Sequence, residues 1–501
     1  MKNKVVIIGS GLGGLVCGYI LAKNGYEVVV LEKNNQIGGC LQTFTRKGTK
    51  FDTGMHYIGS MDEEQILNRF FKYLNLLDDV KISRLNPTGY DVISVAGEHY
   101  KYASGYDNFI EELSQHFPNH RDNIKLYIQK IRDIAAASPL YNLQEINNHV
   151  FIETDYIKTG INEFIASITK NTRLQDVLAG NLPLYGGIKG KTPTYIHALI
   201  NNFYIQSAFR IVGGSDSIAH SLANSIQSFG GKIVTNAEVV KINCDDKKVT
   251  SVQLSTGELC EAAFVISNVH PQATLDKIES PLIRKVYRNR ISELENSISN
   301  FTVYIKFKEH TTPYLNYNYY FYEHDDVWKT QYYDAKKWPE SYLYMHQCIE
   351  DKALFADSAE LIGYMRYDEV KKWEASRIGN RGDDYLEFKL EKAYKLLQKL
   401  EQSFPGINSA IDSYYTSSPL TYRDYTATKE GSMYGIVRDK SFPIQTLVSQ
   451  RTKIPNLFMT GQNINSHGIL GVTIGAMITC AEFLGINTII KQIEQANFLT
   501  P

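Results

Sequence analysis

Hydrophobic and polar positions alternate in two different ways along the chain. Residues 5–8 are continuously apolar and β-branched, as in a strand buried on both faces of a parallel sheet. Helical spacing follows over 15–24, and a second apolar strand is predicted at 27–31. The same strand-and-helix pattern returns over 209–270 and near the C-terminus, where a strand at 456–461, a loop at 462–471 and a helix at 472–485 are predicted.

Between these stretches the pattern is different. An amphipathic helix is predicted at 62–77, short alternating strands at 90–95 and 99–102, and helices over 107–135 and most of 140–204. Residues 271–414 then favour strands at 302–308, within 313–323 and twice within 345–365, before a charged amphipathic helix at 384–403. The first pattern, of apolar strands that alternate with helices, is thus interrupted twice along the chain.

Composition places the chain among globular proteins with more than one core. It has 501 residues, 43% of them hydrophobic and 21% charged, and a formal net charge of −1, so nothing indicates nucleic-acid binding. The six scattered cysteines have no metal-ligand spacing, and they are typical of reduced thiols in a cytosolic protein. No stretch reaches the roughly 18 apolar residues of a membrane span. We therefore expect a cytoplasmic protein without a metal site.

A glycine motif joins the first strand to the first helix. Gly9, Gly11 and Gly14 occupy its first, third and sixth positions, with Gly13 beside the last. Such glycines permit a tight turn, a close approach of backbone to a pyrophosphate, and close packing of helix on strand. Glu32 ends the second strand, where an acid can hold ribose hydroxyls. Because the strand, turn, helix and acid occur in order, the motif predicts a dinucleotide site.

The residues after Glu32 narrow the choice of nucleotide. Glu32-Lys33 followed by Gly38-Gly39 resembles the extension found in FAD-binding flavoproteins related to amine oxidases and phytoene desaturases. The resemblance implies FAD as the cofactor. No second glycine motif in a strand-and-helix context follows, so stable NAD(P)H binding is not predicted, and the external electron donor or acceptor stays unidentified.

Two further motifs resemble one branch of that family. GGCxxTF, which contains Cys40, and FDTGMHYIG at 51–59 resemble the retinol saturase and carotenoid isomerase branch of the phytoene desaturases. The resemblance implies that the segment around Val239 meets the adenine, and that the C-terminal strand, loop and helix approach the flavin, where a helix N-terminus stabilises negative charge. It adds these C-terminal cofactor contacts: Gly461, Gln462, Asn463, Gly468, Gly471 and Val472.

Pattern and resemblance together predict an α/β fold. Its Rossmann-type FAD-binding domain is discontinuous, over 1–77, 205–270 and 415–501, as in amine oxidases and phytoene desaturases. An interleaved α+β substrate domain is expected over 78–204 and 271–414.

The resemblance implies an oxidoreductase that acts on C–C or C=C bonds of an apolar polyene or isoprenoid. Retinol saturase-like reduction comes first, with carotenoid isomerisation or desaturation as the alternative. An amine or amino-acid oxidase and a non-catalytic prenyl-binding escort protein share the fold and remain open. His56, Tyr57 and His467 are the candidate proton donors, although a lone histidine often has only a structural role.

Two expectations concern the substrate. The tyrosines crowded into 314–322 either line an apolar tunnel or form an exposed hairpin. An apolar substrate without a membrane span in the enzyme implies peripheral membrane contact. The helix expected near 281–298 carries apolar residues beside Arg284, Lys285, Arg288 and Arg290, and it is either this dock or an ordinary solvated helix.

Overall fold

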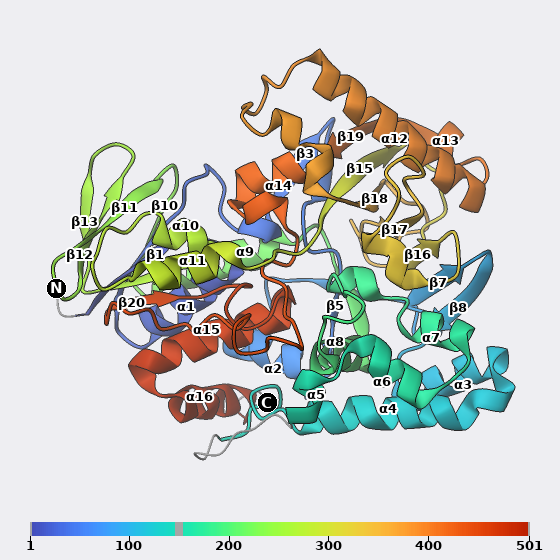
Figure 1. The fold of residues 1–501 in the computed structure, drawn as a ribbon, viewed down its shortest axis with the longest axis horizontal. Helices are drawn as coiled ribbons and strands as arrows, with labels where there is room; N and C mark the ends of the chain where they lie inside the picture. The colour runs from blue at the N-terminus through green and yellow to red at the C-terminus, as the bar shows by residue number, and fades with distance from the viewer. Residues whose placement is uncertain (1–2, 146–153, 499–501) are drawn as a thin grey trace.

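The computed structural model describes residues 3–145 and 154–498. Two sheets lie side by side in it (Figure 1). The first is entirely parallel, as predicted for an α/β fold, with the strand order β10-β2-β1-β14-β20. Its strands are β10 (Lys232–Val234), β2 (Glu27–Leu31), β1 (Lys4–Ile8), β14 (Phe264–Ser267) and β20 (Leu457–Met459).

The apolar strands of the first sheet are buried on both faces because each face has its own cover. Val5 and Ile7 face a core shared with the helices α1 (Leu12–Lys23), α9 (Asp216–Ser228) and α15 (Gly468–Leu484). Val6 and Ile8 face the antiparallel strands β11 (Val239–Cys244), β12 (Val249–Leu254) and β13 (Leu259–Glu261), with α10 (Pro271–Leu275) and α11 (Lys285–Glu293). The continuous apolar run therefore serves two cores.

The second sheet has seven strands, in the order β19-β15-β18-β17-β16-β7-β8. They are β19 (Ile411–Ser417), β15 (Ser299–Phe307), β18 (Ser358–Met365), β17 (Ser341–His346), β16 (Asn318–Tyr322), β7 (Asp91–Val95) and β8 (Glu98–Tyr102). All neighbours are antiparallel except β16 and β7, which are parallel. The predicted domain boundaries stay a prediction.

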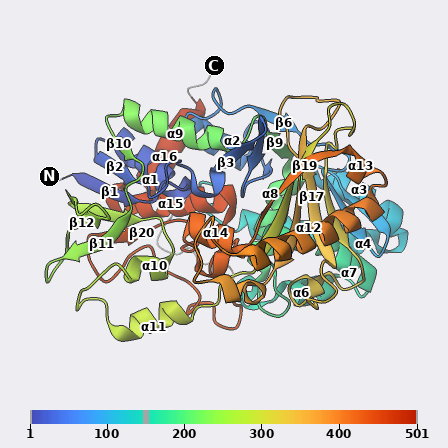
Figure 2. The ribbon, with the colours of Figure 1, turned by 90° about the horizontal axis from the view of Figure 1, so that it is seen from above.

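Helices cover both faces of the second sheet, which lies beside the first in the view from above (Figure 2). One face packs on α3 (Tyr106–His116), α4 (Arg121–Ala136), α6 (Ile161–Ile168), α7 (Thr172–Leu178) and α8 (Thr194–Gln206). The other packs on α12 (Asp383–Ser403) and α13 (Ile407–Ala410). The α5 helix (Thr154–Lys158) precedes α6, and part of the helical stretch predicted at 140–204 lies outside the described residues.

Smaller elements connect the two sheets. They are the hairpin β3 (Thr43–Arg46) and β4 (Thr49–Asp52), the strands β5 (Ile58–Gly59), β6 (Ile82–Arg84) and β9 (Ala208–Ile211), and the helices α2 (Ile66–Tyr73), α14 (Pro419–Thr426) and α16 (Ile486–Phe498). In the described residues no single helix is long and apolar enough to cross a membrane; α15 and α16 meet such a criterion only as a pair bent by 118°.

Three sequence predictions need correction. The C-terminal helix begins at Gly468, so 468–471 is helix and not loop. The helix expected near 281–298 is limited to Lys285–Glu293. The tyrosines of 318–322 form neither a tunnel wall nor an exposed hairpin, because β16 is an inner strand and Tyr319, Tyr320 and Tyr322 are buried in the two cores on either side of it.

Candidate flavin and substrate site

The turn between β1 and α1 brings helix and strand into direct contact. Gly9 has a φ of +92°, which glycine adopts without strain, and its N–H donates to Leu31 O on β2 at 2.8 Å. A Cβ added at Gly14 would lie 2.2 Å from Gly9 O. Gly14 thus acts in packing, and it does not line the cavity described below.

Asn268, which follows β14, fills the space over the other glycines. An added Cβ at Gly11 would lie 2.9 Å from its Nδ2, and one at Gly13 or Gly461 would lie 2.7 Å from its Oδ1. Both ends of the predicted cofactor site, which are far apart in sequence, therefore meet at one side chain. The chain needs glycine here for its own packing as well as for a ligand.

Glu32 is buried and ties the turn together. Its Oε2 accepts from Ser10 N at 3.0 Å and from Ser10 Oγ at 2.6 Å, while its Oε1 accepts from Asn34 N at 2.9 Å. Burying a carboxylate is costly unless it is hydrogen-bonded, and these three donors meet that need. Glu32 also lines the neighbouring cavity, so it can serve the turn and a ligand together.

A cavity of about 300 Å³ runs along these residues. Its wall comes from the residues that follow the neighbouring strands β1, β2 and β14, and from the start of β11. The C-terminal strand, loop and helix complete it. All but two of the predicted cofactor residues line it: Gly9, Gly11, Gly13, Glu32, Lys33, Gly38, Gly39, Cys40, Val239, Gly461, Gln462, Asn463, Gly468 and Val472. Gly14 and Gly471 do not; a Cβ at Gly471 would meet Ser466.

Two of these side chains already have protein partners. Lys33 Nζ donates to Asp424 O at 2.6 Å, and Asn463 Oδ1 accepts from Ile436 N at 3.0 Å. Asn463 thus fastens the segment after α14 to the C-terminal loop, a structural role that the sequence does not reveal. The N-terminus of α15, at Gly468, lies on the cavity and adds the positive end of a helix dipole.

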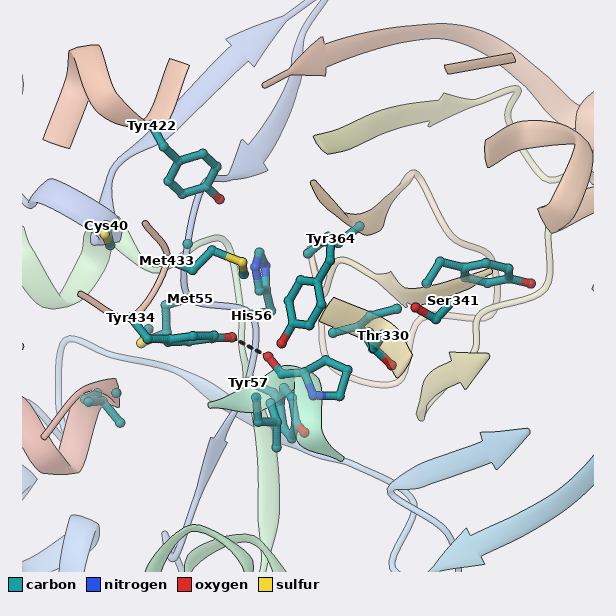
Figure 3. Close-up of a pocket in the computed structure, with 18 of the residues that line it drawn as sticks. Cys40, Met55, His56, Tyr57, Thr330, Ser341, Tyr364, Tyr422, Met433 and Tyr434 are labelled. Carbon is teal, nitrogen blue, oxygen red and sulfur yellow. Dashed lines mark hydrogen bonds between the residues drawn. The ribbon is translucent and has the colours of Figure 1, made fainter. Parts of the chain in front are cut away.

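A second cavity, of about 120 Å³, adjoins the first, and Figure 3 shows the residues that line it. The two cavities share Cys40, Gly54, Met55, Met433, Tyr434, Gly468 and Ile469. The rest of its wall is mostly aromatic and aliphatic, including Tyr204, Leu343, Ile362, Tyr364 and Tyr422, and no carboxylate is among the lining residues. Such a lining suits an apolar ligand.

His56 is the one histidine among the lining residues of this second cavity. Its Nδ1 lies 2.5 Å from Glu360 Oε2, and Glu360 is 1% exposed on β18, where its Oε1 accepts from Gln347 Nε2 at 2.7 Å. Burial acts to lower the pKa of His56, but the Glu360 carboxylate outweighs it and raises that pKa above the ordinary histidine value. His56 is therefore protonated more readily than a free imidazole, although it lies in an apolar site, where Figure 3 shows it between Met433, Tyr364 and Tyr434.

Asp52 is a second carboxyl group close enough to His56 to influence its pKa. Its Oδ1 accepts from Ser215 N at 2.8 Å and from Ser215 Oγ at 2.6 Å. Burial and the charge of Glu360 raise the pKa of Asp52 to about 6, against the hydrogen bonds from Ser215. Negative charge on two sides of His56 thus stabilises its imidazolium.

Tyr57 also lines the second cavity, whereas His467 lies outside it. Tyr57 OH donates to Asp91 Oδ2 at 3.1 Å and lies 2.7 Å from Tyr320 OH; burial raises the pKa of Tyr57 well above its usual value, so it keeps its proton. His467 lines a third, adjoining cavity of about 210 Å³. Burial and Arg438 lower the pKa of His467 to about 4, so at neutral pH it is uncharged.

Glu360 and Gln347 were not among the candidates from sequence. The one available signal was a single charge within the apolar strand 358–365, because a carboxylate in a buried strand needs a partner. The partner, His56, lies about 300 residues away in sequence, on a different segment of the fold.

The residues of the first cavity fit a flavin dinucleotide. Glycine backbone, two helix N-termini and Lys33 offer donors to a pyrophosphate, and the buried Glu32 offers an acceptor to ribose hydroxyls. Because Asn268 fills the space next to Gly11 and Gly13, a residue with a side chain would clash with it at either position.

Comparisons with known proteins agree with this reading. Over 97% of the chain it is 28% identical to the human all-trans-retinol 13,14-reductase, of which 86% is covered. It is 24% identical to the 4,4'-diaponeurosporene oxygenase of Staphylococcus aureus, with 93% and 95% of the two chains covered. The crystal structure of an oxidoreductase from Methanosarcina mazei superposes with a TM-score of 0.63 at 19% identity, covering 95% of this chain and 99% of that one. The family model of flavin-containing amine oxidoreductases matches residues 12–479. The chain therefore belongs to this family, and its cofactor is FAD.

Proposed function

We propose that this protein reduces a C=C bond of a long apolar polyene of the retinoid or carotenoid kind. The observation that carries the proposal is the pairing of His56 with the buried Glu360 in an aromatic cavity continuous with the cofactor cavity. Two relatives named for retinol reduction and diaponeurosporene oxygenation support an apolar polyene as the substrate class.

The residues have distinct tasks in this reaction. Bound FAD supplies hydride chemistry, and Gly11, Gly13, Glu32 and the N-terminus of α15 would hold it. Tyr204, Ile362 and Tyr364 orient the polyene and exclude water. Because Glu360 engages His56 Nδ1, Nε2 is the nitrogen left to donate a proton to the carbon next to the one that receives hydride. One hydride and one proton together saturate the bond.

The same cavity disfavours an amine oxidase. Its lining has no carboxylate to attract an ammonium ion, and the raised pKa of His56 favours a cationic imidazole, which repels one. Desaturation requires a proton acceptor, whereas the raised pKa of His56 favours a proton donor. The cofactor residues that line the first cavity favour a flavoprotein over a prenyl-binding escort protein.

Mass spectrometry distinguishes these reactions directly. The dithionite-reduced holoenzyme is incubated anaerobically with all-trans-retinol and mixed carotenoids, and the apolar extract is analysed. A gain of two hydrogens supports the proposal. Loss of two hydrogens means desaturation, and an unchanged mass with altered retention means isomerisation; either result overturns it. Flavin reduction by amines would establish the oxidase instead.

We also propose that the protein collects its substrate at an anionic membrane surface. Val286 on α11 is 81% exposed and Ile444 is 80% exposed. Arg290 Nη1 donates to Gln445 O at 2.8 Å, which holds the loop with Ile444 beside α11. The α11 helix projects at the lower edge of Figure 2. Apolar side chains next to cations are typical of interfacial binding.

The basic residues predicted for this dock are not equivalent. Arg288 donates to Leu275 O and Ile278 O at 2.5 and 2.6 Å, and Arg290 is held by the loop, so Arg284 and Lys285 are the exposed cations. In liposome flotation, Val286→Asp with Ile444→Asp should abolish binding to anionic vesicles. Leu390→Asp, at an exposed position of α12, is the matched control. Equal flotation of all three proteins would exclude this surface.

A further inference from the structure

A fourth cavity, of about 460 Å³, shares Cys40 and Tyr422 with the second cavity, to which the polyene is assigned. It shares Gly39, Cys40, Tyr425 and Thr426 with the cofactor cavity. The remaining wall comes from the β3–β4 hairpin, β15, α12, β19 and α14. It is larger than the other three cavities, and neither the cofactor nor the substrate assignment uses it.

The charged side chains that line this cavity are all basic. Lys389 and Arg46 line it, and no Asp or Glu does. Lys389 Nζ donates to Thr416 O at 2.8 Å, and in the described part of the chain it has no ion pair with a carboxylate. Burial and the nearby Arg381 lower the pKa of Lys389 to about 8. An ammonium group surrounded by neutral and cationic groups attracts an anion.

The rest of the lining is aromatic and hydroxylic. Five rings, of Phe44, Tyr304, Tyr415, Tyr422 and Tyr425, line the cavity together with hydroxyl groups of threonine and serine. Arg46 and Tyr425 are exposed, so the cavity reaches the surface at their side. Aromatic rings pack on flat ring systems, and lysine and arginine bind phosphate.

We propose that this cavity binds an aromatic ring that carries a phosphate group, the chemistry of a mononucleotide. Lys389 and Arg46 hold the phosphate, and the tyrosine rings hold the flat ring. The site is distinct from the cofactor cavity but shares one wall with it, so the ligand lies next to the cofactor. The inference does not depend on the proposed reduction of polyenes.

Calorimetric titration of the FAD-loaded holoenzyme tests this with three probes. AMP carries both ring and phosphate, adenosine carries only the ring, and inorganic phosphate carries only the anion. AMP should bind in the millimolar range or tighter, and each of the other two at least tenfold more weakly. Flavin absorbance recorded in parallel establishes that FAD is not displaced.

Variants then locate the site. Lys389→Met keeps the apolar stem but removes the charge, so AMP affinity should fall about tenfold or more while adenosine affinity stays unchanged. Lys395→Met, on the same helix, is the matched control and should bind AMP normally. Arg46→Gln, at an exposed position of the hairpin, tests the site independently if Lys389→Met unfolds.

Three results would overturn the proposal. These are no AMP binding to the holoenzyme, AMP affinity unchanged in both Lys389→Met and Arg46→Gln, and phosphate binding as tightly as AMP. Loss of polyene reduction with intact AMP binding, or the reverse, separates this inference from the proposed function.

Discussion

Glu360 shows how one residue sets the chemistry of its neighbour. Every position of β18 is buried, so its carboxylate would be costly without partners. His56 and Gln347 supply them, and the Glu360 carboxylate in turn raises the pKa of His56. Breaking a buried pair by removing one partner typically costs about 3–5 kcal/mol.

His56→Gln tests the proton donor. The amide keeps polarity and similar size but carries no transferable proton, so turnover of the polyene should fall by about 10²- to 10⁴-fold. FAD content should be unchanged, because His56 does not line the cofactor cavity. Single-turnover reduction with retained flavin absorbance is the measurement. Full activity of the variant would remove His56 from the mechanism.

Glu360→Gln should change the pH dependence. The raised pKa of His56 means that its stabilising contribution is complete below the ordinary histidine pKa of about 6.5 and is lost as pH rises through the raised folded-state value. Activity should decline over the same rise. Without the carboxylate, burial dominates and lowers the pKa of His56, so the decline in activity should move to lower pH, and the loss of stability with rising pH should disappear or reverse. Glu309→Gln, at an exposed position, is the control, and coincident profiles for all three proteins would contradict the coupling.

Glu32→Ala should affect the cofactor and the turn together. A lost charge-assisted hydrogen bond is worth about 1.5–3 kcal/mol, so FAD affinity should fall by one to two decades. Because Ser10 and Asn34 also lose their acceptor, the free energy of unfolding of the apoprotein should fall by about 1–3 kcal/mol. Dialysis followed by flavin quantification, with urea unfolding of the apoprotein, measures both. Unchanged flavin content would refute the assignment.

At the scale of elements, the contact between β1 and α1 is the tightest constraint. Gly14→Ala should lower the thermal unfolding temperature and expel FAD, because the new Cβ would lie 2.2 Å from Gly9 O and force the helix off the strand. Gly475→Ala on α15 is the matched control: its Cβ meets only Asn465, at 3.5 Å, so it should be tolerated. Equal behaviour of the two variants would contradict this packing.

Elements with local signals were predictable from sequence. The strand at 27–31 has the predicted bounds, because an apolar run between a glycine turn and an acid defines it locally. The start of α15 was not predictable, since Gly468 and Gly471 are typical of a loop, yet the helix begins at Gly468. The tyrosines of β16 are buried only because segments distant in sequence pack on both faces of its sheet. The pairing of His56 with Glu360 likewise depends on tertiary contacts.

At the scale of the whole molecule, cofactor binding links distant parts of the chain. The cofactor cavity takes its wall from residues between 8 and 55, between 237 and 277, and between 425 and 472. A ligand at 1,000 times its dissociation constant adds about 4.1 kcal/mol to the stability of the folded state. Removing FAD should therefore lower the unfolding temperature by several degrees, and added FAD should restore it. Identical scanning calorimetry traces for apoprotein and holoprotein would contradict a cavity built from all three segments.

The strand order of the first sheet has a consequence during synthesis. β1 and β2 leave the ribosome first, but β20 and α15, which complete their sheet and one of its faces, follow about 450 residues later. At 5–20 residues per second, about 20–90 s pass between the synthesis of the glycine turn and that of β20 and α15. During that interval its apolar strands lack their final cover, so the nascent chain must be protected until its last segment emerges. A ribosome that stops before β20 releases a chain that cannot complete the cofactor cavity, however intact its N-terminal motif is.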